Sequence, residues 1–292
     1  MGLKHAAAPA RADAGTVLRL AVLLQAGVAP ADAWRYLAEA GDAAAAVVAA
    51  KLGAGGDVPS AIGALAGWGD VAAAWRIAET VGAPLAESLR GIAAALQDAA
   101  RTRDEVRIAL AEPAGTARLM SWLPLVAVAL GAALGFDTLR TLATNPIGIG
   151  CALGGVGLIL AAHRWNTRLV RRADPDEAVA GLGADLMAIA LSGGVSLDRA
   201  TELVRAAGAV QPDDETRGIL TLSHSAGVPA AELLRAAAGL ARHRARTDGR
   251  MRAARLSSSL LVPLGVCTLP AFLLLGVAPM LLSVLSTTPL SL

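Results

Sequence analysis

Three long stretches of the sequence carry no charged residue, and they constrain the fold more than any other feature. They cover residues 119–136, 141–162 and 256–292. An α-helix of about 20 apolar residues crosses the hydrocarbon core of a bilayer. We therefore expect three transmembrane helices, at residues 119–136, 146–163 and 256–285. The last of these predicted helices, at 256–285, contains three prolines, which predict a kink.

Arginine residues beside these stretches predict their orientation. Four arginines lie at residues 101–118, four at 164–172 and six at 242–255, whereas the connection between the first two spans holds only Arg140. Basic residues favour the cytoplasmic side. We therefore expect two cytoplasmic segments, an external loop and an external tail, at residues 14–118, 164–255, 137–145 and 286–292. Residues 1–13 lack the apolar core of a signal peptide, so we expect a disordered cytoplasmic N-terminus that is not cleaved.

The composition fits helical domains in water that are attached to membrane helices. Hydrophobic residues make up 55% of the chain and charged residues 17%, against about 25% charged in a typical soluble domain. Acidic and basic residues interrupt the alanine-rich region 14–112 every few positions, and each would cost about 2.5–3.5 kcal/mol at the centre of a span. That region is therefore expected outside the bilayer. The net charge of +2 gives no support to nucleic-acid binding.

Apolar residues outside the predicted spans recur with helical spacing. Leu85, Leu89, Ile92 and Leu96 share one helix face, and Leu182, Leu186 and Ile189 share another. Leu197 and Val204 follow the same spacing less regularly. Sustained alternation of apolar and polar residues, the mark of strands, is almost absent. The sequence predicts an all-α fold with two cytoplasmic antiparallel helical bundles joined to three transmembrane helices.

Glycine and proline residues predict the turns between these helices, and the turns repeat. LLQAGVAPADAW at residues 23–34 resembles ALSGGVSLDRAT at 190–201, which lies 167 positions later. GAPLAESLR at 82–90 aligns with GVPAAELLR at 227–235, which lies 145 positions later. Glycine ends a helix in the left-handed conformation, and proline suits the first turn of the next helix. The repeats predict an internal duplication, with turn residues at Gly27, Pro30, Gly82, Pro84, Gly194, Gly227 and Pro229.

Motifs that carry catalysis or hold a cofactor are missing from the sequence. Neither lysine lies in a phosphate-binding loop, so we do not expect the chain to hydrolyse ATP. The sequence contains no HExxH, no GxSxG and no cysteine–histidine cluster with zinc spacing. His224 lies between two serines, but neighbouring residues on a helix point apart, which argues against a nucleophile–base pair. We expect no enzyme activity, no catalytic residue, no cofactor and no metal.

Exposed charges on the predicted hairpins are candidate partner contacts. They are Arg76, Glu79, Glu87 and Arg90 in the first half, and Glu202, Arg205, Glu232 and Arg235 in the second. A solvated helix face is the alternative interpretation for each of them.

Several of these stretches resemble one protein family. WGDVAAAWRIAETVGAPLAESLRGIA at 68–93 and the region 135–173 are similar to the F-domain family of the type II secretion system, in particular to its TadB/TadC branch, which serves the tight-adherence (Flp) pilus. LMAIALSGGVSLDRA at 186–200, HSAGVPAAELLRAAA at 224–238 and residues 260–285 carry the resemblance in the second half. TadB and TadC types carry one helical bundle each, whereas this sequence predicts two.

The resemblance implies an inner-membrane platform or scaffold subunit of a type II secretion or type IV (Tad/Flp) pilus machine. Such a subunit couples a cytoplasmic ATPase to pilin assembly or to secretion. Its expected partners are that ATPase, a pilin or pseudopilin, membrane lipids, and a second platform subunit or another copy of the chain. The alternative is an oligomeric helical permease or channel, although the three charge-free stretches at 119–136, 141–162 and 256–292 contain no acidic, basic or histidine residue. A nucleic-acid partner is not expected, because the arginine-rich run at 242–255 leads directly into a span, where anionic lipid is its natural contact.

Overall fold

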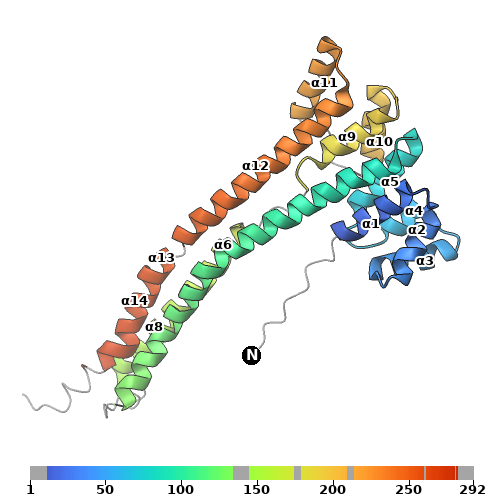
Figure 1. The fold of residues 1–292 in the computed structure, drawn as a ribbon. Coiled ribbons are helices and arrows are strands. Elements are labelled where there is room, and N and C mark those ends of the chain that lie inside the picture. Colours follow the sequence, from blue (N-terminus) through green and yellow to red (C-terminus); the bar gives the residue numbers. More distant parts are fainter. Residues whose placement is uncertain are drawn as a thin grey trace, which may run out of the picture. The chain divides into compact units, whose positions relative to one another are not determined.

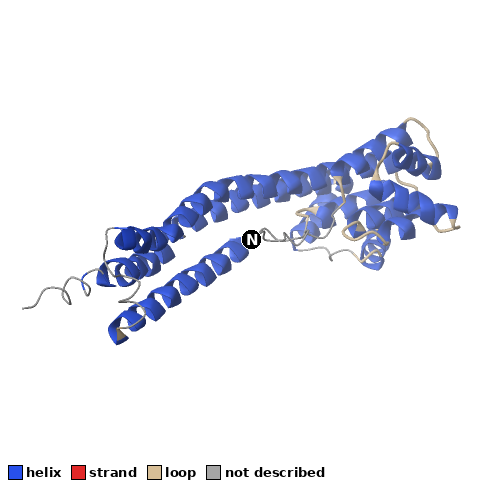
Figure 2. Cartoon of the chain, turned by 90° about the horizontal axis from the view of Figure 1, so that it is seen from below, coloured by secondary structure: helices blue, strands red, loops and turns tan. Residues whose placement is uncertain are grey.

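The computed structural model describes residues 12–133, 145–173, 179–208, 214–259, 261–279 and 281. Over these residues the chain consists of α-helices, turns and two short π-helical segments, and no strand occurs among them (Figures 1 and 2). The all-α prediction is confirmed for this part of the chain. Residues 1–11, the predicted external tail and the predicted external loop except Asn145 lie outside the described residues.

The chain divides into two compact units. Unit 1 comprises residues 1–102 and 177–246, and unit 2 comprises residues 103–176 and 247–292. Each unit therefore combines a segment from the first half of the chain with one from the second half. The two longest helices, α6 (Leu85–Ala133) and α12 (Ala230–Ser259), contribute to both units.

Unit 1 contains short helices joined by tight turns, together with the first parts of α6 and α12. In the first half these helices are α1 (Ala14–Gln25), α2 (Pro30–Glu39), α3 (Ala43–Gly53), α4 (Val58–Gly63) and α5 (Gly69–Val81). In the second half they are α9 (Leu182–Ser192), α10 (Leu197–Ala206) and α11 (Asp214–Ala226).

Aspartate side chains begin several of these helices. The carboxylate of Asp13 accepts hydrogen bonds from the backbone N–H groups of Gly15 and Thr16 at 3.3 and 3.1 Å. Asp42 and Asp57 cap α3 and α4 in the same way. Such a cap pairs a backbone donor that has no partner within the helix, which stabilises the helix by about 1 kcal/mol. Asp13, at the end of the segment predicted to be disordered, thus takes part in α1.

The two halves of the chain share one hydrophobic core in unit 1. Trp34, Trp75 and Leu89 of the first half and Leu186 and Leu234 of the second are each no more than 1% exposed and belong to the same cluster. The helix faces predicted from Leu85–Leu96 and Leu182–Ile189 lie in or against this core. Leu197 is an exception, because it is 43% exposed.

A close backbone contact joins the two halves within this core. A Cβ atom added to Gly193, at the end of α9, would lie 2.5 Å from the carbonyl oxygen of Val81 in α5. Within the second half, a Cβ atom added to Gly181 would lie 2.6 Å from the carbonyl oxygen of Ala238 in α12. Glycine permits both approaches because it has no side chain. The two cytoplasmic segments predicted from the sequence therefore pack together as one unit.

Unit 2 contains the candidate membrane helices. They are the second part of α6, α8 (Pro146–Ala173), α13 (Leu261–Pro263), η1 (Leu264–Thr268), α14 (Leu269–Phe272) and η2 (Leu273–Val277). The helix α8 packs against η1, α14 and η2. Gly155 in α8 makes a close contact, since an added Cβ would lie 2.4 Å from Cγ of Leu275.

One helix in the described part of the chain is long and apolar enough to cross a membrane. It covers Pro146–Leu169, with a mean hydropathy of 1.7, and only 17% of its apolar window is buried. This helix contains the second predicted span. The other two predicted spans are helical where they are described, at residues 119–133 and at 261–279, but they are not singled out by length and hydropathy. The π-helical segments η1 and η2 follow Pro263 and Pro270, where proline removes a backbone donor.

Candidate functional site

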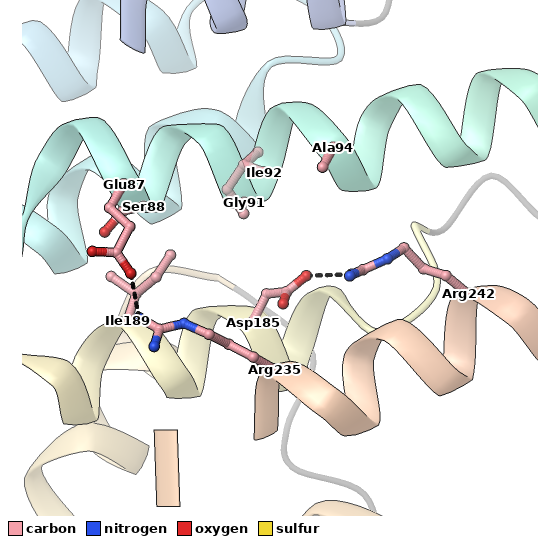
Figure 3. Close-up of a pocket in the computed structure, with 9 residues that line it drawn as sticks. All are labelled: Glu87, Ser88, Gly91, Ile92, Ala94, Asp185, Ile189, Arg235 and Arg242. Carbon is pink, nitrogen blue, oxygen red and sulfur yellow. Dashed lines mark hydrogen bonds and ion pairs between the residues drawn. The ribbon is translucent and has the colours of Figure 1, made fainter. Parts of the chain in front are cut away.

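A small cavity in unit 1 is lined by residues from both halves of the chain (Figure 3). Its volume is about 170 Å³, and α6, α9 and α12 supply its walls. The lining residues are Glu87, Ser88, Gly91, Ile92, Ala94, Asp185, Ile189, Arg235 and Arg242. Two of them, Glu87 and Arg235, are among the eight charges singled out as candidate contacts.

Glu87 and Arg235 form an ion pair across the opening of this cavity. Nη2 of Arg235 lies 3.2 Å from Oε1 of Glu87, and its Nη1 donates to Glu232 at 2.6 Å. The side chains of Glu87 and Glu232 are 64% and 70% exposed. Exposed ion pairs contribute at most about 1 kcal/mol to stability, so these groups can exchange partners at little cost.

Asp185 and Arg242 form a second and more buried ion pair in the same cavity (Figure 3). Nη1 of Arg242 donates to Oδ2 of Asp185 at 2.6 Å, and the two side chains are 18% and 10% exposed. Nε of Arg242 also lies 3.5 Å from Asp98 on α6. A single guanidinium therefore holds carboxylates from both halves of the chain.

Burial raises the pKa of Asp185 above its usual value, although the charge of Arg242 acts in the opposite direction. Removal of the carboxylate from water disfavours its charged form, and this effect exceeds the attraction of the nearby guanidinium. The ion pair is therefore poor in net stabilisation and sensitive to the loss of either partner.

The chemistry of this site suits recognition of charged side chains. Two carboxylates and two guanidinium groups surround a small surface formed by Ile92, Ala94 and Ile189. Among the described residues, no group of three or more histidine, cysteine or acidic side chains is placed to hold a metal ion. Arginine and carboxylate groups at an opening bind complementary charges through short, directional hydrogen bonds.

The other candidate contacts lie on separate helices of unit 1. Arg76 and Glu79 are exposed on α5, and Glu202 and Arg205 are exposed on α10, where Glu202 pairs with Arg199 at 2.7 Å. The guanidinium of Arg90 donates to the side-chain oxygen of Gln25 on α1. The structure thus pairs both Glu87 and Glu232 with Arg235. Of the other five, Arg90 lies one turn after Glu87 on α6 but bonds to Gln25, and the remaining four lie on α5 and α10.

The glycines proposed as turn residues all lie between helices, and each has a positive φ angle. The φ values are +86°, +68°, +78° and +65° at Gly27, Gly82, Gly194 and Gly227. Pro30 is the first residue of α2, and Pro84 and Pro229 immediately precede α6 and α12.

Asp185 and Arg242 were not among the residues singled out from the sequence. Asp185 is the one acidic residue in the apolar run LGADLMAIAL, and such an interruption on a buried helix face could have indicated a buried ion pair. Arg242 gave no comparable signal, because it stands first in a run of arginines that also fits the cytoplasmic border of a span.

Comparisons with known proteins match part of the chain. Residues 17–132 match the family model described as type II secretion system (T2SS), protein F. No curated protein and no solved structure matches the chain. Proteins of this family are membrane platform proteins of secretion and pilus machines and are not enzymes. The matched region covers most of α1, all of α2 to α5 and nearly all of α6, and this part of the chain is similar to the type II secretion system protein F family.

Proposed function

We propose that the chain is an inner-membrane platform subunit of a type II secretion or type IV (Tad/Flp) pilus machine. In this proposal unit 1 lies in the cytoplasm, binds a secretion ATPase and transmits its conformational changes to a pilin or pseudopilin at the membrane. The match of residues 17–132 to the protein F family is the observation that carries the proposal.

The continuity of two helices supports a mechanical role. The helices α6 and α12 each contribute to the core of unit 1 and continue into unit 2 without a described break. Leu89 and Leu234, one on each helix, are fully buried in unit 1. A displacement imposed on the cytoplasmic core by a motor would therefore move residues at the start of both helices together.

The exposed apolar face of α8 supports attachment to the membrane. Ile147, Leu153, Val156 and Leu160 are all more than half exposed. The transfer of such side chains from water into a bilayer is favourable by about 25 cal/mol of free energy per Å² of apolar surface. Lipid is therefore the natural environment of this helix.

The proposal is tested by titration of the full chain in lipid nanodiscs with a secretion ATPase from the same organism. We expect saturable binding and a change in the rate of ATP hydrolysis. Charge reversal at the candidate contacts, for example Glu79→Lys or Glu87→Lys, should weaken binding, whereas Lys51→Glu on the exposed surface of α3 serves as the matched control. The absence of binding by the intact chain would contradict the proposal. Solute flux into sealed liposomes that contain the chain without the ATPase would favour a channel.

A further inference from the structure

The helices of unit 1 reproduce the sequence repeat with one omission. The bounds of α2 and α10 differ by 167 positions at both ends, and those of α5 and α11 differ by 145. The helices α6 and α12 also begin 145 positions apart. Residues 40–68 connect α2 to α5 and contain α3 and α4, whereas only residues 207–213 connect α10 to α11. The second half therefore has no room for a counterpart of the α3–α4 hairpin.

In the first half, α4 of this hairpin covers part of α5. The helix α4 packs against α5, and a Cβ atom added to Gly63 of α4 would lie 3.5 Å from Cβ of Ala72. Ala72, which faces α4, is only 4% exposed. Ala73 and Ile77 are 5% and 1% exposed on the same helix, which also packs against α9. In all, seven of the 13 residues of α5 are buried.

The equivalent face of α11 is open. The residues 145 positions after Ala72, Ala73 and Ile77 are Arg217, Gly218 and Leu222, and all three are exposed. Leu222 is 53% exposed, and Thr216 is the one buried residue of α11. A Cβ atom added to Gly218 would meet no atom within 4 Å. This set of Arg217, Gly218 and Leu222 is called the α11 face below.

The first half also indicates what fits on such a face. The helix α4 covers α5 with small and aliphatic residues, since its buried residues are Pro59, Ala61 and Ile62. Gly218 leaves space for a close helix, and Leu222 offers an apolar contact. Arg217, at the position of Ala72, adds a positive charge whose partner is Asp214, an exposed neighbour on the same helix. A carboxylate from another helix can replace Asp214 at little cost, because such pairs contribute only a few tenths of a kcal/mol.

From these observations we propose that the α11 face binds a short amphipathic helix of a partner protein, in the place that α4 takes on α5. The partner helix presents small or aliphatic side chains to Gly218 and Leu222 and a carboxylate to Arg217. The partner is defined by this chemistry alone, so the inference does not depend on the proposed coupling to an ATPase.

The test is site-specific photo-crosslinking of the full chain in its native membranes. p-Benzoylphenylalanine replaces Leu222, and a control chain carries it at Leu197, which is 43% exposed on α10. We expect an adduct with a different protein from position 222 only, and mass spectrometry should locate it in a helical segment that contains an aspartate or glutamate. Arg217→Glu should reduce the yield at least tenfold, and Arg217→Lys should retain it.

A second measurement checks the same face without the crosslinker. In chains whose native cysteines are replaced by alanine, Leu222→Cys should react with a maleimide at least tenfold more slowly in membranes that contain the partner than in the purified chain, and Leu197→Cys should react equally in both. Any one of four crosslinking results would overturn the proposal. They are an adduct with the mass of two copies, an adduct within one chain, a crosslinking yield at position 222 no greater than that at Leu197, and a yield that Arg217→Glu leaves unchanged. Equal labelling of Leu222→Cys in both preparations would also overturn it.

Discussion

The buried ion pair between Asp185 and Arg242 allows a quantitative test of the shared core. Arg242→Met keeps most of the side-chain volume but removes the guanidinium that lies 2.6 Å from Asp185. The carboxylate, 10% exposed, then remains buried without its main positive partner. Loss of one member of a buried pair costs about 3–5 kcal/mol. At about 2–4 °C per kcal/mol for a unit of this size, Tm should fall by roughly 6–20 °C.

The loss of stability in Arg242→Met should depend on pH. Because the pKa of Asp185 is raised in the folded chain, the folded state holds this proton up to a higher pH than the unfolded state does. The stability associated with this group is therefore fully present below the unfolded pKa of about 3.9 and is lost as the pH rises through the folded pKa. Removal of Arg242 raises that pKa further, so the difference in Tm between the variant and the wild type should be smaller at pH 4.5 than at pH 7.5.

The assay is thermal unfolding of the detergent-solubilised full chain, followed by tryptophan fluorescence. Arg199→Met is the matched control, because Arg199 and Glu202 form an exposed pair and its loss should cost less than about 1 kcal/mol. The double variant Asp185→Asn with Arg242→Met should recover part of the lost stability. Three results would refute the reasoning. They are a loss of stability below 1 kcal/mol for Arg242→Met, an equal loss of stability at both pH values, and no recovery of stability in the double variant.

The remaining predictions concern packing. Gly193→Ala places a Cβ 2.5 Å from the carbonyl oxygen of Val81 and should destabilise unit 1 by about 1–3 kcal/mol. The control Gly53→Ala adds a Cβ that meets nothing within 4 Å and should leave the stability unchanged. Equal unfolding midpoints for the two variants would contradict the contact between the halves. Leu234→Ala removes a fully buried side chain and should lower the free energy of unfolding by about 2–5 kcal/mol. Leu240 is 45% exposed, so Leu240→Ala should have only a small effect. Comparable effects of the two substitutions in denaturant titrations would argue against the shared core. Gly155→Ala should separate α8 from η2 and lower thermal stability in detergent, while Gly157→Ala, with open space around it, should leave the melting curve unchanged; the reverse order would exclude this packing.

The sequence predicts the helices well because their signals are local. Glycine and proline residues such as Gly82 and Pro30 mark helix ends, and residues with helical spacing such as Leu89 and Ile92 mark the buried faces. These properties depend on residues within one or two turns of the same helix. Leu197 shows the limit, because its spacing fits an apolar face and yet it is exposed.

The candidate site depends on contacts that the sequence does not encode locally. Arg242 and Asp185 are separated by 57 positions and meet only because both halves contribute to one core. The repeat predicts two similar bundles, but it does not reveal that they pack together. The two repeats are spaced by 167 and 145 positions, and the structure accounts for the difference, because the second half lacks a counterpart of α3 and α4.

The central claim is that both halves of unit 1 lie on the cytoplasmic side of the membrane, where a single motor can bind them. It is tested most directly by labelling single cysteines in spheroplasts with a membrane-impermeant maleimide, in a chain that carries Cys151→Ala and Cys267→Ala. Glu79→Cys in the first half and Glu202→Cys in the second should both stay unlabelled until the membrane is permeabilised, whereas a cysteine in the predicted external tail at 286–292 should react at once. Labelling of either Glu79→Cys or Glu202→Cys in intact spheroplasts would contradict the claim.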